Sequence, residues 1–78
     1  MQLSDAIRKR INNLLKVKKM NLWKLYKATG VPASTLSYFM NKKRELITIK
    51  TLLHICEGFN MTIREFFDDP IFDDVEQE

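Results

Sequence analysis

The sequence is poor in the residue types that build cross-links, metal centres and catalytic sites. Its 78 residues include one cysteine, Cys56, and one histidine, His54. A single cysteine excludes an intrachain disulfide, and the two residues provide no zinc-type spacing. The sequence also lacks a Ser-His-Asp arrangement and a phosphate-binding glycine loop, so nothing in it indicates an enzyme. We therefore expect a cytoplasmic protein that needs no disulfide, metal or cofactor.

Long apolar runs are absent as well. No stretch approaches the ~18 residues that a membrane-spanning helix needs, so we expect no membrane association. The first ten residues, "MQLSDAIRKR", lack the apolar core of a secretory signal. Glycine and proline occur only twice each, which leaves few positions where the chain can turn sharply. A length of 78 residues allows one small domain around one hydrophobic core.

Acidic residues are scarce through most of the chain, and basic residues are missing from its end. Residues 1–67 hold all thirteen lysines and arginines against four acidic residues, a net charge of +9. Residues 68–78 hold six acidic residues and no basic one, a net charge of −6. A basic body favours a polyanionic partner, most often nucleic acid, although charge alone fits an ordinary solvated domain equally well.

Apolar residues recur at helical spacing through residues 1–67, and this spacing predicts a compact all-α bundle of five short helices. Ser4, Asn21 and Thr48 are the predicted N-caps of the first, second and fourth helices. Residues 62–65, "TIRE", have the pattern of a capping box that opens the fifth helix.

The chain's few turn-forming residues are predicted to separate these helices. Gly30 stands where a C-cap glycine would end the second helix, and Gly58 is expected to end the fourth. Pro32 suits the first turn of the third helix, and Asn41 is expected to end that helix in a left-handed conformation. Trp23 is expected to pack at the edge of the core.

Residues 68–78, "DDPIFDDVEQE", form a predicted acidic C-terminal tail with two open interpretations. Its charge suits a disordered, solubilising segment. Alternatively, Phe72 and Val75 dock on the body of the protein or on a second subunit, and the acidic residues temper non-specific binding to DNA.

One segment, "LYKATGVPASTLSYF", joins two helical stretches through Gly30. A turn this tight needs a residue that tolerates a positive φ, and glycine does so at the least cost. Leu25 in the first stretch faces Leu36 and Phe39 in the second, which fixes a steep angle between them. This is the geometry of a helix-turn-helix, whose second helix enters the major groove of DNA.

Residues 4–67 resemble the phage-repressor and Cro-type (XRE) helix-turn-helix family. The resemblance lies in the segment above, in the "NKK" that follows it, and in "TIKTLLHICEGFNMTIREFF", which is similar to the family's fourth and fifth helices. It implies a lambda-repressor-like fold, with residues 1–67 as the DNA-binding domain. It also implies a sequence-specific transcriptional regulator, expected to be a repressor, that inserts its third helix into double-stranded DNA. We expect it to bind a near-palindromic site as a homodimer.

The resemblance also assigns roles to individual residues of this chain. Base-reading roles fall on Ala33, Ser34, Ser37 and Tyr38. Phosphate contacts fall on Asn21 and Leu22, through backbone N–H groups, and on Asn41, Lys42 and Lys43. Lys24 and Arg44 are further candidates for phosphate contacts. Short polar side chains let the helix backbone approach base edges closely, but serine and alanine discriminate weakly between bases.

The chain departs from the family pattern at two places. The family usually has a small residue where Tyr26 stands, so we expect a wider gap between the second and third helices. Its loop commonly reads Asn-Gly-Lys, whereas residues 41–43 read Asn-Lys-Lys.

Two other interpretations stay open. The serines of the third helix also fit a solvated face with capping roles. The whole chain could instead be a protein-interaction module, such as an antitoxin-like partner, that uses the same helical fold without reading DNA.

Overall fold

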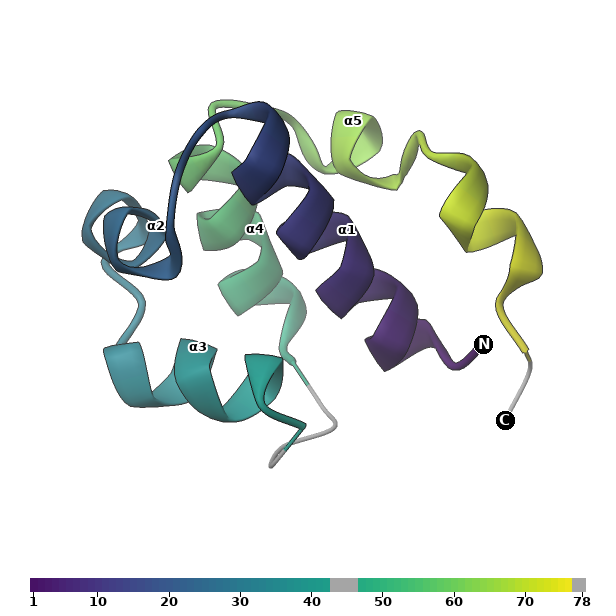
Figure 1. The fold of residues 1–78 in the computed structure, drawn as a ribbon, viewed down its shortest axis with the longest axis horizontal. Coiled ribbons are helices and arrows are strands. Elements are labelled where there is room, and N and C mark those ends of the chain that lie inside the picture. Colours follow the sequence, from purple (N-terminus) through teal and green to yellow (C-terminus); the bar gives the residue numbers. More distant parts are fainter. Residues whose placement is uncertain (43–46, 77–78) are drawn as a thin grey trace.

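A computed structural model describes residues 1–42 and 47–76, and these residues form helices joined by short turns (Figure 1). The α-helices are α1 (Leu3–Val17), α2 (Leu22–Thr29), α3 (Ala33–Met40), α4 (Ile49–Gly58) and α5 (Ile63–Phe67), and a 3₁₀ helix covers Pro70–Asp74. The predicted all-α fold of five short helices is confirmed, and the described residues contain no strand. Helices α2 and α3 lie at the side of the molecule away from the 3₁₀ helix (Figure 1).

A single apolar core joins all five α-helices. Its largest fully buried side chains are Ile11, Leu25, Leu36, Phe39, Ile55, Cys56, Phe59 and Phe66. The apolar stripe of α1 enters this core at helical spacing, as the sequence predicts, through Ile7, Ile11 and Leu14. Cys56 is fully buried, and this burial raises the pKa of its thiol, so it behaves as a small apolar side chain.

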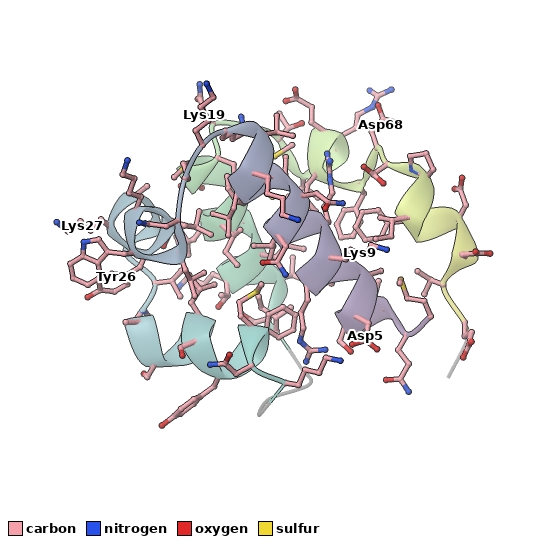
Figure 2. All side chains as sticks on the ribbon, in the orientation of Figure 1. Asp5, Lys9, Lys19, Tyr26, Lys27 and Asp68 are labelled. Atoms are coloured by element: carbon pink, nitrogen blue, oxygen red, sulfur yellow. The ribbon has the colours of Figure 1, made fainter. Side chains whose placement is uncertain are left out.

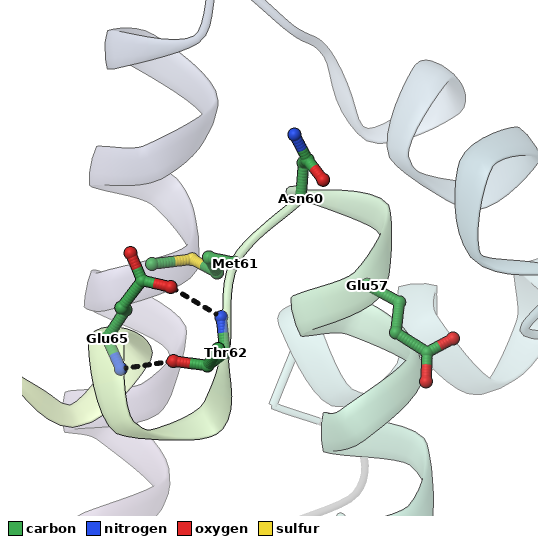
Figure 3. Close-up of a pocket in the computed structure, with 5 residues that line it drawn as sticks. All are labelled: Glu57, Asn60, Met61, Thr62 and Glu65. Atoms are coloured by element: carbon green, nitrogen blue, oxygen red, sulfur yellow. Dashed lines mark hydrogen bonds between the residues drawn. The ribbon is translucent and has the colours of Figure 1, made fainter.

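Most of the predicted helix ends are confirmed. The Asn21 side chain accepts the Lys24 backbone N–H at 2.8 Å, and Thr48 Oγ1 accepts the Thr51 N–H at 3.0 Å. The capping box is complete, because Thr62 Oγ1 accepts the Glu65 N–H at 3.1 Å and the Glu65 carboxylate accepts the Thr62 N–H at 3.0 Å (Figure 3). Each bond satisfies a backbone donor that the first turn of a helix leaves unpaired.

Three of the predicted helix ends are wrong in detail. The first helix begins at Leu3, so the N-cap position falls on Gln2 rather than Ser4, and no side chain caps it. Pro32 occupies the N-cap of α3 and not its first turn, since its fixed φ suits both positions. Asn41 has φ −89°, and the left-handed residue is Lys42, with φ 62°. The left-handed residue therefore comes one position later than the sequence indicates. It is the position where the family's loop commonly has glycine.

Helix α4 ends at Gly58, as the sequence predicts, and this glycine also serves packing. It is the last residue of α4, and the left-handed residue that follows this helix is Asn60, with φ 58°. A Cβ atom on Gly58 would lie 2.5 Å from Thr29 Cγ2 and 3.3 Å from Leu25 Cδ1. The absence of a side chain at Gly58 thus lets α4 approach α2 closely.

The described part of the acidic segment packs on the body of the protein. Phe72 in the 3₁₀ helix lies with its ring centroid 4.8 Å from that of Phe67, in a cluster that includes Phe66. Asp69 forms a 3.1 Å ion pair with Arg10 on α1. Docking of Phe72 was one of the two interpretations of this segment, and its geometry supports that one; the division of the chain at residue 67 stays a prediction.

No helix in the part of the chain that the structure describes is long and apolar enough to cross a membrane.

Candidate nucleic-acid interface

Helices α2 and α3 are held at a fixed angle by a buried contact and a tight turn. Leu25 and Leu36 are buried where the two helices meet, and Val31 between them is buried as well. Gly30 ends α2 with φ 70°, the left-handed conformation predicted for it. Thr29 Oγ1 donates to the Tyr26 carbonyl at 3.2 Å and accepts the Val31 N–H at 3.1 Å. These bonds leave the turn little freedom, so the orientation of α3 follows from the turn itself.

The four residues assigned to base reading lie together along α3. Ala33, Ser34 and Tyr38 are exposed, and Ser37 is half-buried. Ser37 Oγ accepts a hydrogen bond from the Asn41 side-chain amide at 3.2 Å, one turn further along. The result is a short surface without charge, formed by small side chains beside one exposed aromatic ring. Helix α3 can therefore come close to a partner without clashing or desolvating a charge.

Cationic and amide groups flank this surface in the sequence, before α3 on α2 and directly after α3. Lys24 is exposed in the first turn of α2, where the first backbone N–H groups of the helix have no intrahelical partner. The Asn21 side-chain oxygen accepts the capping bond, which fixes the start of α2, where the resemblance implies phosphate contacts through backbone N–H groups. Asn41 and Lys42 are exposed just beyond α3. Lys43 and Arg44 lie outside the described residues.

Sequence reasoning missed a buried arginine that anchors the end of α3. Arg8 on α1 is only 6% exposed. Its Nε donates to the Phe39 carbonyl at 2.6 Å, its guanidinium lies 4.6 Å from the centroid of the Phe39 ring, and its Nη1 pairs with Asp5 at 3.0 Å. A cation at the C-terminal carbonyls of a helix satisfies them and complements the helix dipole. The signal was present, because position 8 shares a helical face with the buried Ile11 and Leu15.

The Arg8 network extends to a residue assigned to phosphate binding. Lys42 Nζ lies 3.8 Å from Asp5, the same carboxylate that pairs with Arg8. Lys42 is largely exposed, so this contact is weak and leaves the ammonium group accessible to solvent and ligands.

Trp23 is not packed at the edge of the core, as the sequence suggested, but is 58% exposed on α2. Its ring centroid lies 5.4 Å from that of Tyr26, and Lys27 Nζ lies 4.9 Å from it. Figure 2 shows Lys27 on the outer side of α2, where it is exposed. The spacing of Leu22, Leu25 and Tyr26 assigns the inner face to those residues, which leaves Trp23 outside.

A hollow of about 160 Å³ opens between α2 and α3, beside Tyr26. We call it the α2–α3 hollow, and its lining residues are Leu22, Trp23, Tyr26, Ala33, Leu36 and Ser37. It lies where the sequence led us to expect a gap between the two helices. Two of the residues assigned to base reading, Ala33 and Ser37, form part of its wall.

A second hollow, of about 410 Å³, lies at the turn from α4 to α5 (Figure 3). Glu57 and Glu65 contribute its charged groups. Glu65 is committed to the capping box, and the bonds it accepts from Thr62 lower the pKa of its carboxyl group. Among the described residues, no group of three histidine, cysteine or acidic side chains could hold a metal ion. The described residues of this hollow therefore include no metal-binding group of that kind.

Comparison with known proteins agrees with the geometry of α2 and α3. A family model described as the Cro/C1-type HTH DNA-binding domain matches residues 10–70. No curated protein and no solved structure matches the chain. The matched residues make up most of the chain and contain α2, the Gly30 turn and α3 entire. The chain therefore belongs to the Cro/C1-type helix-turn-helix family of DNA-binding domains.

Proposed function

We propose that this DNA-binding protein is a sequence-specific transcriptional repressor that inserts α3 into the major groove. The observation that carries the proposal is the uncharged surface of Ala33, Ser34, Ser37 and Tyr38 on α3, with exposed lysines before and after it in the sequence. An α-helix fits the major groove, and small side chains let its backbone approach the base edges. A repressor role follows from occupancy alone, because a bound protein of this size blocks access to the DNA it covers.

The basic residues on either side of α3 hold the DNA backbone in this proposal. Lys24 lies before α3 and Lys42 after it, so each can meet a phosphate while α3 occupies the groove between them. Serine and alanine discriminate weakly between bases, so much of the affinity comes from these phosphate contacts. Affinity should consequently fall steeply as the salt concentration rises.

The protein binds as a homodimer in this proposal, because one α3 reaches too few base pairs to select a site. Two half-sites on one face of the duplex lie about 34 Å apart. The longest dimension of the molecule is 32 Å, so two copies side by side fit that spacing. The dimer would give a near-palindromic site, since a two-fold axis relates the two copies.

Fluorescence anisotropy with a selected duplex and a scrambled one tests these roles. Lys24→Ala should weaken binding to both duplexes equally and lower the slope of log affinity against log salt by about 1. Lys9→Ala removes the same charge from an exposed position on α1 and should leave the slope nearly unchanged. Ser34→Ala should change the preference between duplexes instead. The proposal fails if neither duplex binds at low salt, or if Lys24→Ala and Ser34→Ala act alike.

A protein-interaction module is the second candidate function. Ile49 and Leu53 lie one turn apart on α4 and are 79% and 41% exposed. An exposed apolar pair of this kind suits a protein partner or a second copy of the chain. A stoichiometric protein complex, with no duplex sequence enriched in selection, would favour this function over DNA reading.

A further inference from the structure

We propose that the α2–α3 hollow receives the C5 methyl group of a thymine in the bound DNA. Trp23 and Tyr26, neither of which the family resemblance assigns to DNA, then become specificity-determining residues. This inference rests on the proposed function, because it requires α3 to lie in the major groove.

The position of the hollow would place it against the base edges in the major groove when α3 binds there. Its wall includes Ala33 and Ser37 from α3, which also belong to the surface assigned to base reading. Ala33 and Trp23 are both exposed, so the hollow is open to solvent at its rim. A base edge that contacts Ala33 and Ser37 therefore lies directly against the opening.

The chemistry of the lining selects the ligand. Leucine, alanine and aromatic side chains form most of the wall, and serine contributes one hydroxyl group. Hydrogen-bonding groups dominate the major-groove edges of adenine, guanine and cytosine, whereas thymine presents a methyl group there. A lining with few polar groups can favour the methyl group but cannot pair well with the polar edges of the other three bases.

The size of the hollow and the rigidity of its wall suit this ligand. An apolar cavity of roughly 150 Å³ can hold a benzene ring. The α2–α3 hollow, at about 160 Å³, therefore has room for a methyl group and the edge of the base that carries it. Lys27 lies over one ring of the wall, since its Nζ is 4.9 Å from the Trp23 centroid, and Tyr26 supports the same ring. The wall is thus formed before DNA arrives.

Replacement of thymine by uracil tests the proposal, because uracil lacks only the methyl group. Each thymine of the selected duplex is replaced in turn, and affinity is measured by anisotropy at fixed salt. We expect one thymine per half-site whose replacement weakens binding by about fourfold or more, the loss that corresponds to one buried methyl group. Restoring the methyl group at that position should restore the affinity.

Variants of the wall assign the effect to the hollow. Trp23→Ala should abolish the thymine–uracil difference while leaving the fold intact, because Trp23 is mostly exposed. Tyr26→Phe keeps the ring and should retain the difference. Ile49→Ala removes an exposed apolar side chain from α4, outside the hollow, and should also retain it.

Each remaining outcome overturns a different statement. If no duplex binds, the proposed function fails, and this inference fails with it. If a preferred duplex binds and every thymine can be replaced by uracil without loss, the function stands and the inference fails. If the thymine–uracil difference persists in Trp23→Ala, the methyl group is read elsewhere and the hollow is not its site.

Discussion

At the scale of single residues, two arginines of α1 each hold the C-terminal end of another helix. Arg8 donates to the Phe39 carbonyl at the end of α3, and Arg10 donates to the Phe66 carbonyl at the end of α5, at 2.7 Å. Arg10 also reaches the Glu65 carbonyl at 3.0 Å. Both arginines satisfy carbonyl groups that a helix end leaves unpaired. The basic composition of α1 thus serves the fold as well as any contact with DNA.

Replacing the buried arginine should show how much α3 depends on it. Arg8→Met keeps the apolar stem but removes the charged hydrogen bond to the Phe39 carbonyl, which keeps only backbone donors such as the Lys42 N–H at 3.2 Å, and removes the 3.0 Å ion pair with Asp5. A hydrogen bond to a charged group contributes about 1.5–3 kcal/mol, so we expect a loss of that order in the free energy of unfolding. Urea denaturation measures it. Lys9→Met, at the exposed neighbouring position, is the matched control and should change stability by less than about 0.5 kcal/mol. Equal effects of the two substitutions would refute the anchoring role of Arg8.

Glu65 gives the stability of the protein a specific acid dependence. The hydrogen bonds from the Thr62 backbone and side chain lower its pKa below the ordinary value of 4.5. Because folding favours the ionised form, its contribution is complete above pH 4.5 and is lost as the pH falls through the lower pKa of the folded state. Glu65→Gln keeps an acceptor oxygen for the capping box without a titrating group.

The stability of the wild-type protein relative to Glu65→Gln should therefore be constant at neutral pH and should decline in acid. Thermal unfolding of both proteins across the acidic range measures the difference. If the stabilities of the two proteins differ by the same amount at every pH, then folding does not favour the ionised form of Glu65.

At the scale of the helices, the contact between α2 and α4 depends on one missing side chain. Gly58 has no positive φ, so the backbone conformation does not require glycine at this position. Packing requires it, because a Cβ atom on residue 58 would lie 2.5 Å from Thr29 Cγ2. Thr29 Oγ1 is needed for the turn before α3, because it bonds both Tyr26 and Val31. Thr29 therefore takes part both in the packing of α4 against α2 and in the turn that orients α3.

Paired substitutions at this contact should be strongly non-additive. Gly58→Ala adds overpacking that costs typically 1–3 kcal/mol, against a gain of about 1 kcal/mol in helix propensity. Thr29→Ser removes Cγ2 and keeps the hydroxyl group. We expect Gly58→Ala to be at least about 1 kcal/mol more favourable in the Thr29→Ser background than in the wild type, as measured by a double-mutant cycle. Additive effects would show that the two side chains do not compete for space.

Helix identity and most helix ends could be predicted from the sequence, because caps such as Asn21, Thr48 and Gly30 act locally. Some errors were local: the N-cap at Gln2 and the left-handed residue at Lys42 each lie within two residues of the predicted position. Gly58 ends α4 as predicted, but its packing against Thr29, far away in the chain, could not be derived from local sequence. Trp23 lies off the face that Leu22, Leu25 and Tyr26 form, so helical spacing could have placed it outside the core.

In the candidate site, the sequence identified features that depend on neighbouring residues and missed features that depend on residues far apart in the chain. The uncharged residues of α3 could be identified from the motif, since helical spacing alone places them together. Arg8 was missed because its partner Phe39 becomes adjacent only in the folded chain. The α2–α3 hollow required the angle between the two helices, and its volume could not be derived from helical spacing.

At the scale of the whole molecule, the chain keeps α2 and α3 apart from its acidic segment. Helices α2 and α3 lie at one side, and the 3₁₀ helix lies at the other beside the N-terminal end of α1 (Figure 1). The Glu76 N–H donates to the Met1 carbonyl at 2.9 Å, which fastens the segment there. The docked acidic segment therefore lies on the opposite side of the molecule from α2 and α3.

The measurement that tests the central claim most directly is selection of bound sequences from a pool of random duplexes, with the intact chain. The account predicts enrichment of a near-palindromic sequence whose two half-sites lie one helical turn apart, about 10–10.5 base pairs centre to centre. Ser34→Ala should shift the enriched bases within each half-site, because Ser34 is exposed on α3. Recovery of no preferred sequence, or of the same sequence by both proteins, would contradict the claim that α3 reads the DNA.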